Sequence, residues 1–270
     1  MAAIHDMTIP LCPNLSYHIF NRGINRKAIF FNEDNYRYFL QKYSNYMRNY
    51  WTTYSWVLME NHFHLIVKVN DEESIAKTAK LDFKRFDQLF VRKHAPLIDQ
   101  VRKKAGLASA ADLTGFKNLS AADLTGFKNP SAADLTGFGN LLNLAELHSS
   151  ELYHLLLTWA ISERFRRFLL GYAKAINKQQ HRTGSLFQKS FRRKLLDTES
   201  YIKTAICYVH HNPIHHGYVI DYDQYTWSSY RERLKWNPND LYGLSEVFGS
   251  VEEFHLCHEA YKYSADPIEF

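Results

Sequence analysis

The sequence predicts an α+β protein in which helices pack on a sheet built around a central hairpin. The strongest strand pattern runs from Thr52 to Val69 and is rich in Tyr, Trp, Val, Ile and Leu, as is typical of paired strands. Glu60 and Asn61 interrupt this run, so we expect a tight turn there. Helical patterns before and after the hairpin supply the layers that cover the sheet.

The other elements follow from local signals along the chain. Asn32 precedes two acidic residues, which is a usual start for a helix. Pro213 lacks an amide N–H, so we expect it to end the last helix. The predicted elements are a strand over 17–20, a helix from 32 to about 50, the two hairpin strands, helices over 74–94 and 152–179, a strand over 185–196 and a helix over 197–211.

Composition places the chain among soluble globular proteins. Its 270 residues suffice for one large domain or two small ones, and no apolar run approaches the length of a membrane helix. The N-terminus lacks the pattern of a secretion signal, so we expect a cytoplasmic protein. The three cysteines are widely scattered, which fits neither a disulfide framework nor a cysteine-based zinc site.

One segment differs from the rest of the chain. Residues 109–141 hold three copies of an 11-residue unit. Each copy has a glycine at mid-repeat and one has Pro130, which argues against a long helix. We therefore expect a domain over 14–233, interrupted by this repeat insertion at 106–141, and a helical tail over 236–270 without an assigned function.

Two histidines open the second hairpin strand, in the triplet His62-Phe63-His64. Residues i and i+2 of a strand project from the same face, so both imidazoles point together while Phe63 points into the core. Paired imidazoles on a strand form half of a site for a divalent transition metal or for Mg²⁺, with oxygen ligands completing the shell. The alternative interpretation is a pair of ordinary sheet histidines.

The last predicted helix carries a second set of polar side chains. Tyr208 and Asn212 are four residues apart and share one helical face. The amide oxygen of Asn212 suits Mg²⁺ or Mn²⁺ as a third ligand, and a tyrosine oxygen beside that ion can attack a phosphodiester. Tyr201 is a rival nucleophile, although its i+4 neighbour Ala205 cannot bind a metal. Four histidines are alternative ligands: His210, His211, His215 and His216.

Ten basic residues between positions 164 and 194 are interleaved with aromatic residues, with no acidic residue among them. A solvated helix face usually mixes both signs of charge, so this pattern favours a surface that binds phosphates and stacks on bases. The predicted nucleic-acid contacts are Arg164, Arg166, Arg167, Lys174, Lys178, Arg182, Lys189, Arg192, Arg193 and Lys194.

Five segments together resemble one protein family, the single-tyrosine HUH transposases, and specifically the REP-associated tyrosine transposase branch of the insertion-sequence 200-like family. These segments are Tyr17–Gly23, Trp56–His64, Gly184–Gln188, Tyr208–Pro213 and Trp227–Tyr230. The resemblance covers about residues 14–100 and 150–233, and the repeats between these parts are not a feature of the family.

The resemblance implies a ferredoxin-like antiparallel sheet with packed helices. It also implies that His62 and His64 bind Mg²⁺ or Mn²⁺ with Asn212 as third ligand, and that Tyr208 becomes linked to a DNA 5′ phosphate. The expected activity is cleavage and rejoining of single-stranded DNA at hairpins, without ATP, by a monomer or a homodimer.

Two other functions stay open at this point. A protein with the same fold and basic surface could bind DNA hairpins without cutting them. A small-molecule metalloenzyme with a His-x-His strand is a third possibility, but its β-barrel needs many more strands than this helix-rich chain offers.

Overall fold

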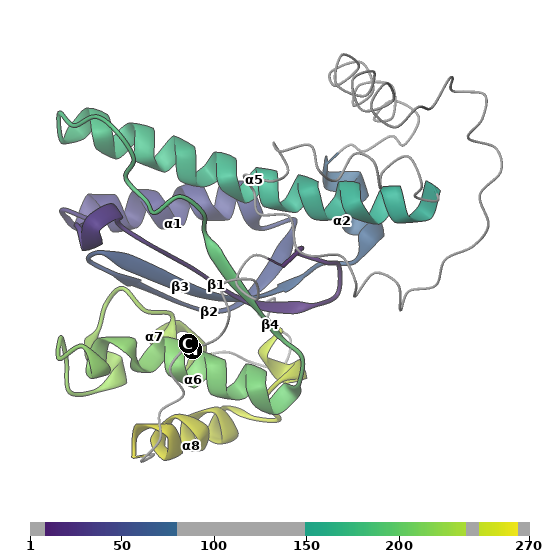
Figure 1. Cartoon of the computed structure of the whole chain (residues 1–270). Helices are drawn as coiled ribbons and strands as arrows, with labels where there is room; N and C mark the ends of the chain where they lie inside the picture. Colours follow the sequence, from purple (N-terminus) through teal and green to yellow (C-terminus); the bar gives the residue numbers. More distant parts are fainter. Residues whose placement is uncertain (1–8, 80–148, 236–242, 264–270) are drawn as a thin grey trace, which may run out of the picture.

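The computed structural model describes residues 9–79, 149–235 and 243–263. Four of its strands form one antiparallel sheet in the order β2-β3-β1-β4, and helices cover both faces of that sheet (Figure 1). The predicted α+β class is therefore confirmed. In the described part of the chain, no helix combines the length and the apolar character needed to span a bilayer.

The sheet is built around the predicted hairpin. Its strands are β1 (Ser16–Arg22), β2 (Trp51–Met59), β3 (His62–Val69) and β4 (Arg192–Leu196). Residues 60 and 61 form the turn between β2 and β3. The register of β1 against β3 sets Phe20 opposite His64 and Arg22 opposite His62, so polar side chains of the two central strands gather at one end of one face.

Alternation along the strands separates two cores. One face carries Ile19, Phe63 and Leu65, which pack with α1 (Glu33–Met47) and α5 (Ser149–Gln179). The side chain of Asn32 caps α1 as predicted, and α2 (Glu72–Ala79) follows β3. Phe63 is fully buried in this core, which confirms that it points away from the two flanking histidines.

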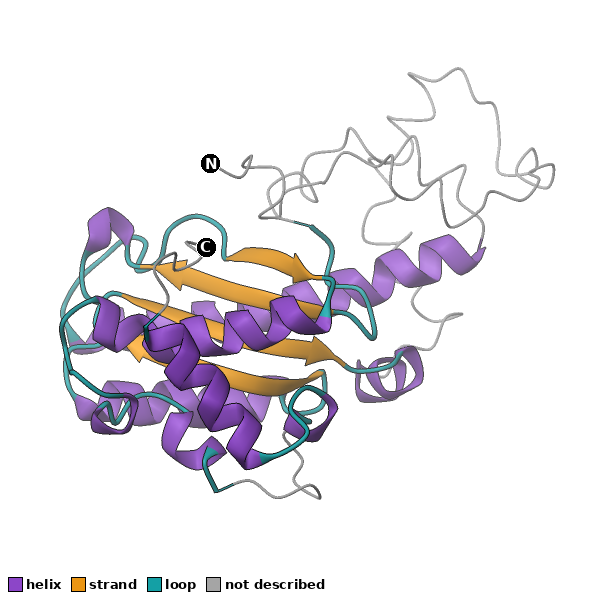
Figure 2. Cartoon of the chain, turned by 90° about the horizontal axis from the view of Figure 1, so that it is seen from below, coloured by secondary structure: helices purple, strands orange, loops and turns teal. Residues whose placement is uncertain are grey.

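The opposite face carries Val57, Met59 and Ile66, which pack with α6 (Glu199–His215) and α8 (Val251–Lys262). In Figure 2, seen from this side, helices of this layer cross the strands. The short helix α7 (Tyr230–Arg233) and 3₁₀ turns link α6 to α8. The predicted helical tail thus includes a helix that belongs to this second core.

Three details differ from the predictions. Helix α6 continues to His215, two residues beyond Pro213, because amides after the proline bond back to carbonyls of the last turn. Strand β4 begins only at Arg192; before it, Phe187 makes one isolated bridge to Gly23. The predicted helix over 74–94 is described to Ala79, and its remainder and the repeats at 109–141 lie outside the described residues.

Candidate functional site

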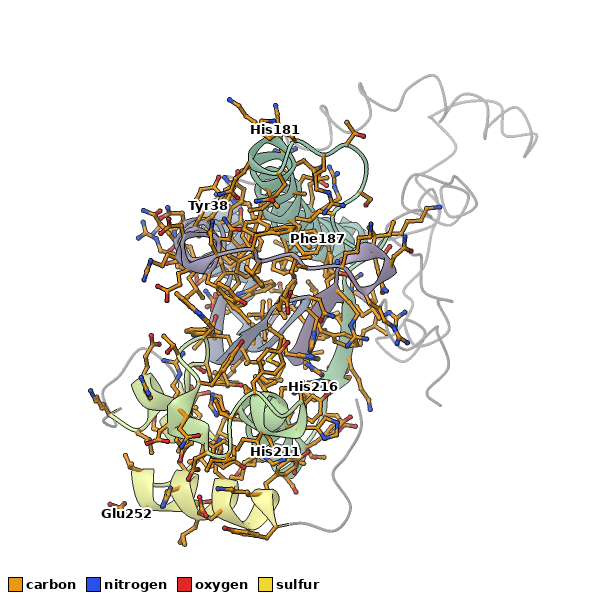
Figure 3. All side chains as sticks on the ribbon, turned by 90° about the vertical axis from the view of Figure 1, so that its left-hand side faces the viewer. Tyr38, His181, Phe187, His211, His216 and Glu252 are labelled. Carbon is orange, nitrogen blue, oxygen red and sulfur yellow. The ribbon has the colours of Figure 1, made fainter. Side chains whose placement is uncertain are left out.

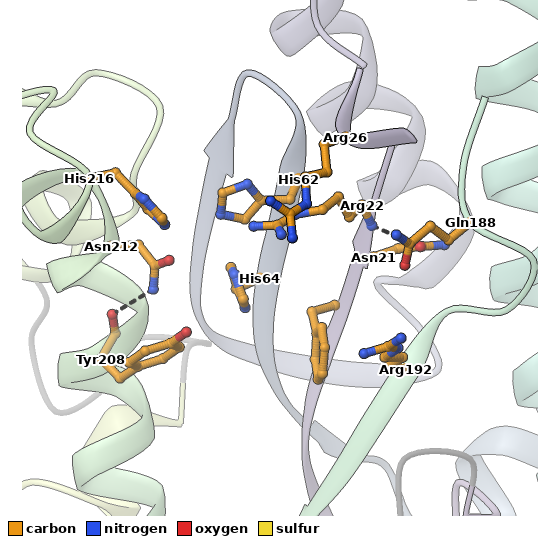
Figure 4. A pocket seen from close by; sticks show the side chains of 11 residues that line it. Asn21, Arg22, Arg26, His62, His64, Gln188, Arg192, Tyr208, Asn212 and His216 are labelled. Carbon is orange, nitrogen blue, oxygen red and sulfur yellow. Dashed lines mark hydrogen bonds between the residues drawn. The ribbon is translucent and has the colours of Figure 1, made fainter. Parts of the chain in front are cut away.

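A pocket of about 340 Å³ lies between the sheet and α6. Strands β1, β3 and β4 form one wall and α6 forms the other, as Figure 4 shows. The described residues that line it include three arginines and no carboxylate. These lining residues are Phe20, Asn21, Arg22, Arg26, His62, His64, Gln188, Arg192, Tyr208, Asn212 and His216.

Hydrogen bonds fix the orientation and the proton of the His62 ring. Its Nδ1 lies 2.6 Å from Oδ1 of Asn61, and the amide nitrogen of Asn61 donates to the carbonyl of Arg26 at 3.1 Å. The oxygen of Asn61 therefore accepts, so Nδ1 of His62 carries the proton. The lone pair is on Nε2, which is buried and has no hydrogen-bond partner among the described residues. Such an atom is suited to bind a cation.

Nδ1 of His64 also has a hydrogen-bond partner, which is another histidine. This atom lies 2.8 Å from Nε2 of His18 on the neighbouring strand. The two rings are nearly parallel, with centroids 5.0 Å apart and an angle of 25° between their planes. Nε2 is thus the ring nitrogen of His64 that is left to bind a ligand in the pocket.

Both pocket imidazoles are held in the neutral form. Burial lowers the pKa of His62 to about 3, and the charges of Arg22 and His216 act in the same direction, while the nearby side chain of Asn212 opposes them. Burial and the neighbouring His18 hold the pKa of His64 well below its ordinary value. Metals bind neutral imidazole, so both rings keep the ligand form across the physiological pH range.

Tyr208 and Asn212 face the histidines from the helix. The Tyr208 ring lies 5.7 Å from the His64 ring and nearly perpendicular to it, and its hydroxyl points toward the strands in Figure 4. Asn212 is only 3% exposed. Its amide nitrogen donates to the Tyr208 carbonyl at 2.9 Å, so its oxygen is the atom available to the pocket and to His62.

A buried chain of hydrogen bonds ties α6 to the sheet. Nδ1 of His258 donates to the Phe254 carbonyl at 2.7 Å, so its Nε2 accepts from Nδ1 of His210 at 2.8 Å. Nε2 of His210 then accepts from the Ser229 hydroxyl at 2.8 Å. That hydroxyl in turn accepts from the Trp56 amide of β2 at 2.9 Å. The donor and the acceptor of each hydrogen bond in this series are therefore fixed, and both histidines are neutral.

The structure separates the alternatives that the sequence left open. Tyr201 does not line the pocket and lies instead near the ammonium of Lys194. His210 belongs to the buried chain described above, and His211 faces Tyr222 and α8. His216 alone of the four alternative histidines lines the pocket, with its ring 5.3 Å from that of His62. Figure 3 shows His216 nearer the sheet and His211 nearer α8.

Most of the predicted nucleic-acid contacts lie away from this pocket. Five of them are on α5, which packs on the opposite face of the sheet: Arg164, Arg166, Arg167, Lys174 and Lys178. Glu163, one residue before the basic run, forms ion pairs with Arg166 and Arg167 at 2.6 and 2.8 Å. The guanidinium of Arg164 donates to the Tyr46 carbonyl and lies over the Tyr46 ring.

The other five basic residues lie on the loop before β4 and on β4 itself. Arg182 donates to the Ser185 carbonyl, and Lys189 is exposed on the same loop. Arg192 lines the pocket. Arg193 projects to the other face, is 4% exposed and donates to the carbonyl of Ile9. Lys194 returns to the α6 side, near His18 and Tyr201.

Several pocket residues were not assigned from the sequence. Arg22 lies on β1 opposite His62. Arg26 enters the pocket from a turn in which Asn25 and Arg26 both have left-handed backbone angles (φ 54° and 58°). His18, Phe20 and Arg22 alternate along one strand, so they share the face of His62 and His64. The alternation of His18 and Arg22 with apolar residues along a buried strand is the sequence signal that could have placed them near the two histidines.

The residues present fit a divalent cation in part. Among the described residues, no three His, Cys, Asp or Glu side chains are placed to hold a metal ion together. The protein ligands would therefore be Nε2 of His62, Nε2 of His64 and the amide oxygen of Asn212. The amide oxygen suits Mn²⁺ or Mg²⁺ and the two imidazoles suit a transition-metal ion, and such a set leaves room for oxygen ligands from a substrate or water.

No protein-family model and no curated protein matches the chain. Among solved structures, it is similar to a REP-associated tyrosine transposase bound to a REP hairpin, with 10% sequence identity and a TM-score of 0.46. That likeness covers 100% of this chain and 95% of the other. Both identity and TM-score are too low to support a function, so the proposals below rest on the geometry of the pocket.

Proposed function

We propose that this protein is a metal-dependent nickase and strand transferase that cuts and rejoins single-stranded DNA at hairpins through a 5′-phosphotyrosine intermediate. One observation carries the proposal. The hydroxyl of Tyr208 and the His62–His64 pair open into the same pocket and come from the same chain. These residues are 146 and 144 positions apart in sequence, taking 208 minus 62 and 208 minus 64, so only the fold brings them together.

Three side chains would hold the ion: His62, His64 and Asn212. When bound there, a divalent cation polarises a phosphate oxygen and stabilises the charge that develops on it. The neutral state of both rings and the orphaned Nε2 of His62 support this assignment. Asn61 and the Tyr208 carbonyl orient the donor atoms of His62 and Asn212.

The chemistry asked of Tyr208 is a single displacement at phosphorus. Its Oη forms a bond to the phosphorus while the bond from phosphorus to the 3′ oxygen breaks. The phenol proton passes to water, and the leaving 3′ oxygen takes up a proton to become a free 3′-OH. The reverse step, in which a 3′-OH attacks the phosphotyrosine, rejoins a strand without ATP because the number of phosphoester bonds does not change.

The arginines of the pocket provide contacts for the DNA backbone. Three arginines line the same cavity as the nucleophile, namely Arg22, Arg26 and Arg192, and none of the described lining residues is a carboxylate. Guanidinium groups bind phosphate oxygens through paired hydrogen bonds. We therefore place the backbone of the strand along this side of the pocket, between β4 and the turn that carries Arg26.

The test is covalent capture. Wild-type protein, mixed with single-stranded hairpin DNA and Mn²⁺, should give an adduct on a denaturing gel that is absent in Tyr208→Phe. Tyr201→Phe is the matched control, because Tyr201 lies on the same helix but outside the pocket, and it should retain the adduct. Binding of many hairpins without any adduct would instead identify a DNA-hairpin-binding protein that does not cut.

A mixing experiment tests whether one chain supplies the whole site. Tyr208→Phe and His64→Gln should each be inactive, and their mixture should stay inactive because each chain lacks part of its own pocket. Recovery of the adduct in the mixture would show that the tyrosine helix is exchanged between two chains of a homodimer. The same preparation of wild-type protein gives the oligomeric state by light scattering.

A further inference from the structure

His18 is a buried polar residue that the proposed chemistry does not use. It lies in the middle of β1 with 0% exposure, on the face toward α6, and its ring is 5.9 Å from that of Tyr208. It does not line the pocket. Its Nε2 lies 2.8 Å from Nδ1 of His64, so its contact is with the side of the His64 ring opposite the pocket.

Two proton arrangements are compatible with this contact. If His18 donates from Nε2, then Nδ1 of His64 holds the lone pair and Nε2 of His64 carries its proton into the pocket, where it cannot bind a cation. If His64 donates from Nδ1, then Nε2 of His64 presents its lone pair to the pocket. The identity of the donor therefore decides whether His64 can be a ligand.

We propose that His18 is a positioning residue that accepts the Nδ1 proton of His64 and thereby holds Nε2 of His64 ready for the cation. This inference rests on the proposed metal-dependent function. It gives His18 the role that Asn61 has for His62, where the hydrogen bonds already fix the acceptor. Metal-bound histidines nearly always donate their second N–H to such a partner.

The packing around His64 supports a role in orientation. The ring is nearly parallel to those of His18 and Phe20, at 25° and 21°, with centroids 5.0 and 5.6 Å away. Tyr208 contacts its edge from the helix. The ring therefore packs beside two neighbours from β1 that also contact each other, and its Nδ1 contact with His18 leaves Nε2 on the side of the pocket.

The first test determines which nitrogen of His64 carries the proton in the wild-type protein. In ¹⁵N-labelled wild-type protein without metal, the ring signals of His64, assigned by their loss in His64→Gln, should be those of the Nδ1–H tautomer. An Nε2–H tautomer would overturn the inference. In His18→Phe, which keeps the ring but removes the acceptor, the His64 signals should shift toward the Nε2–H form, and His18→Gln, which restores an acceptor, should return them.

The second test measures affinity for Mn²⁺ from the electron paramagnetic resonance signal of the free ion. His18→Phe should bind Mn²⁺ roughly 10- to 100-fold more weakly, with recovery in His18→Gln. The matched control is Tyr43→Phe, which removes a buried hydroxyl that accepts from the Trp51 indole at 2.8 Å on the opposite face of the sheet; its Mn²⁺ affinity should stay at the wild-type value.

The possible failures are distinguishable. If wild-type protein binds Mn²⁺ and His18→Phe binds it equally well, the role of His18 is wrong and the proposed function stands. If wild-type protein binds no Mn²⁺, either alone or with hairpin DNA, both the proposed function and the role of His18 are wrong.

Discussion

Replacing Ser229 by alanine removes the side chain through which the tyrosine helix is tied to the sheet. The Ser229 hydroxyl is 0% exposed; it accepts from the Trp56 amide and donates to Nε2 of His210, two residues after Tyr208 on α6. The variant keeps the one backbone bond between these residues, from the Ser229 amide to the Trp56 carbonyl at 3.0 Å. It therefore removes the hydrogen bonds of the side chain and leaves the backbone pairing of Ser229 with β2 in place.

The magnitude follows from the two polar groups that lose their partner. A buried donor or acceptor left without a hydrogen bond costs about 1–3 kcal/mol. The Trp56 amide and the His210 nitrogen are both buried, so Ser229→Ala should lower the free energy of unfolding by about 2–6 kcal/mol, twice the value for one group. This is a large share of the 5–15 kcal/mol typical of a domain.

The neighbouring Ser228 provides the control. It is also buried, but its hydroxyl accepts one long bond, from the Tyr230 amide at 3.3 Å. Ser228→Ala should therefore cost less than about 1 kcal/mol. Both variants are measured by urea unfolding at neutral pH. Equal stabilities of Ser229→Ala and Ser228→Ala would show that the buried chain through His210 does not anchor α6, and the reasoning would be refuted.

Three further outcomes are expected. Gly23→Ala would place a Cβ 1.9 Å from the carbonyl oxygen of Lys27, so it should lower the free energy of unfolding by about 1–3 kcal/mol and weaken DNA binding in a filter assay. In the control Gly171→Ala, the added Cβ meets only the end of a lysine side chain, so neither stability nor DNA binding should fall. Arg192→Gln should reduce the slope of log affinity for DNA against log salt concentration by about 1 and leave the stability unchanged. Arg193→Gln should instead lower the free energy of unfolding by roughly 1.5–3 kcal/mol and leave that slope unchanged. Burial lowers the pKa of His258 from 6.5 to about 3, so between these pH values the unfolded chain binds a proton that the folded protein does not. The free energy of unfolding therefore falls as the pH falls, by about 1.4 kcal/mol per pH unit. In urea titrations, His258→Phe should remove this contribution to the dependence of stability on pH.

The hairpin and the shared faces could be predicted because they depend on local spacing. The i+2 spacing of His62 and His64 sets both rings on one side of β3 wherever the strand lies, and the i+4 spacing of Tyr208 and Asn212 does the same on α6. The α+β class followed from these local patterns as well. What spacing cannot give is that the two faces meet, since that depends on which side of the sheet α6 covers.

The basic run shows where local pattern fails. Its charges were counted from Arg164 onward, and Glu163, the residue before it, forms ion pairs with two of them. Arg193 lies between two outward-facing basic residues, and the strand alternation sends it into the interior, where the Ile9 carbonyl accepts its hydrogen bond. A partner 184 positions away is not visible from sequence. The pocket arginine Arg22 was missed for the same reason, since pairing of β1 with β3 places it.

The positive charge of the pocket predicts that its two proposed ligands, the cation and the DNA, affect each other's affinity. The proposed metal ligands are neutral, three arginines line the cavity, and no described carboxylate does. A divalent cation bound there alone would add to the positive charge of the lining, whereas a phosphodiester would offset it. Mn²⁺ and DNA should therefore bind cooperatively, each raising the affinity of the other by the same factor, on the order of 5- to 150-fold.

The factor is the ratio of the hairpin affinities measured with and without Mn²⁺ in Tyr208→Phe, in which the DNA strand stays intact. It should fall to one when His62 and His64 are both replaced by glutamine. A Mn²⁺ effect that survives that replacement would mean that the ion acts on the DNA itself, and the two histidines would then be ordinary members of the sheet.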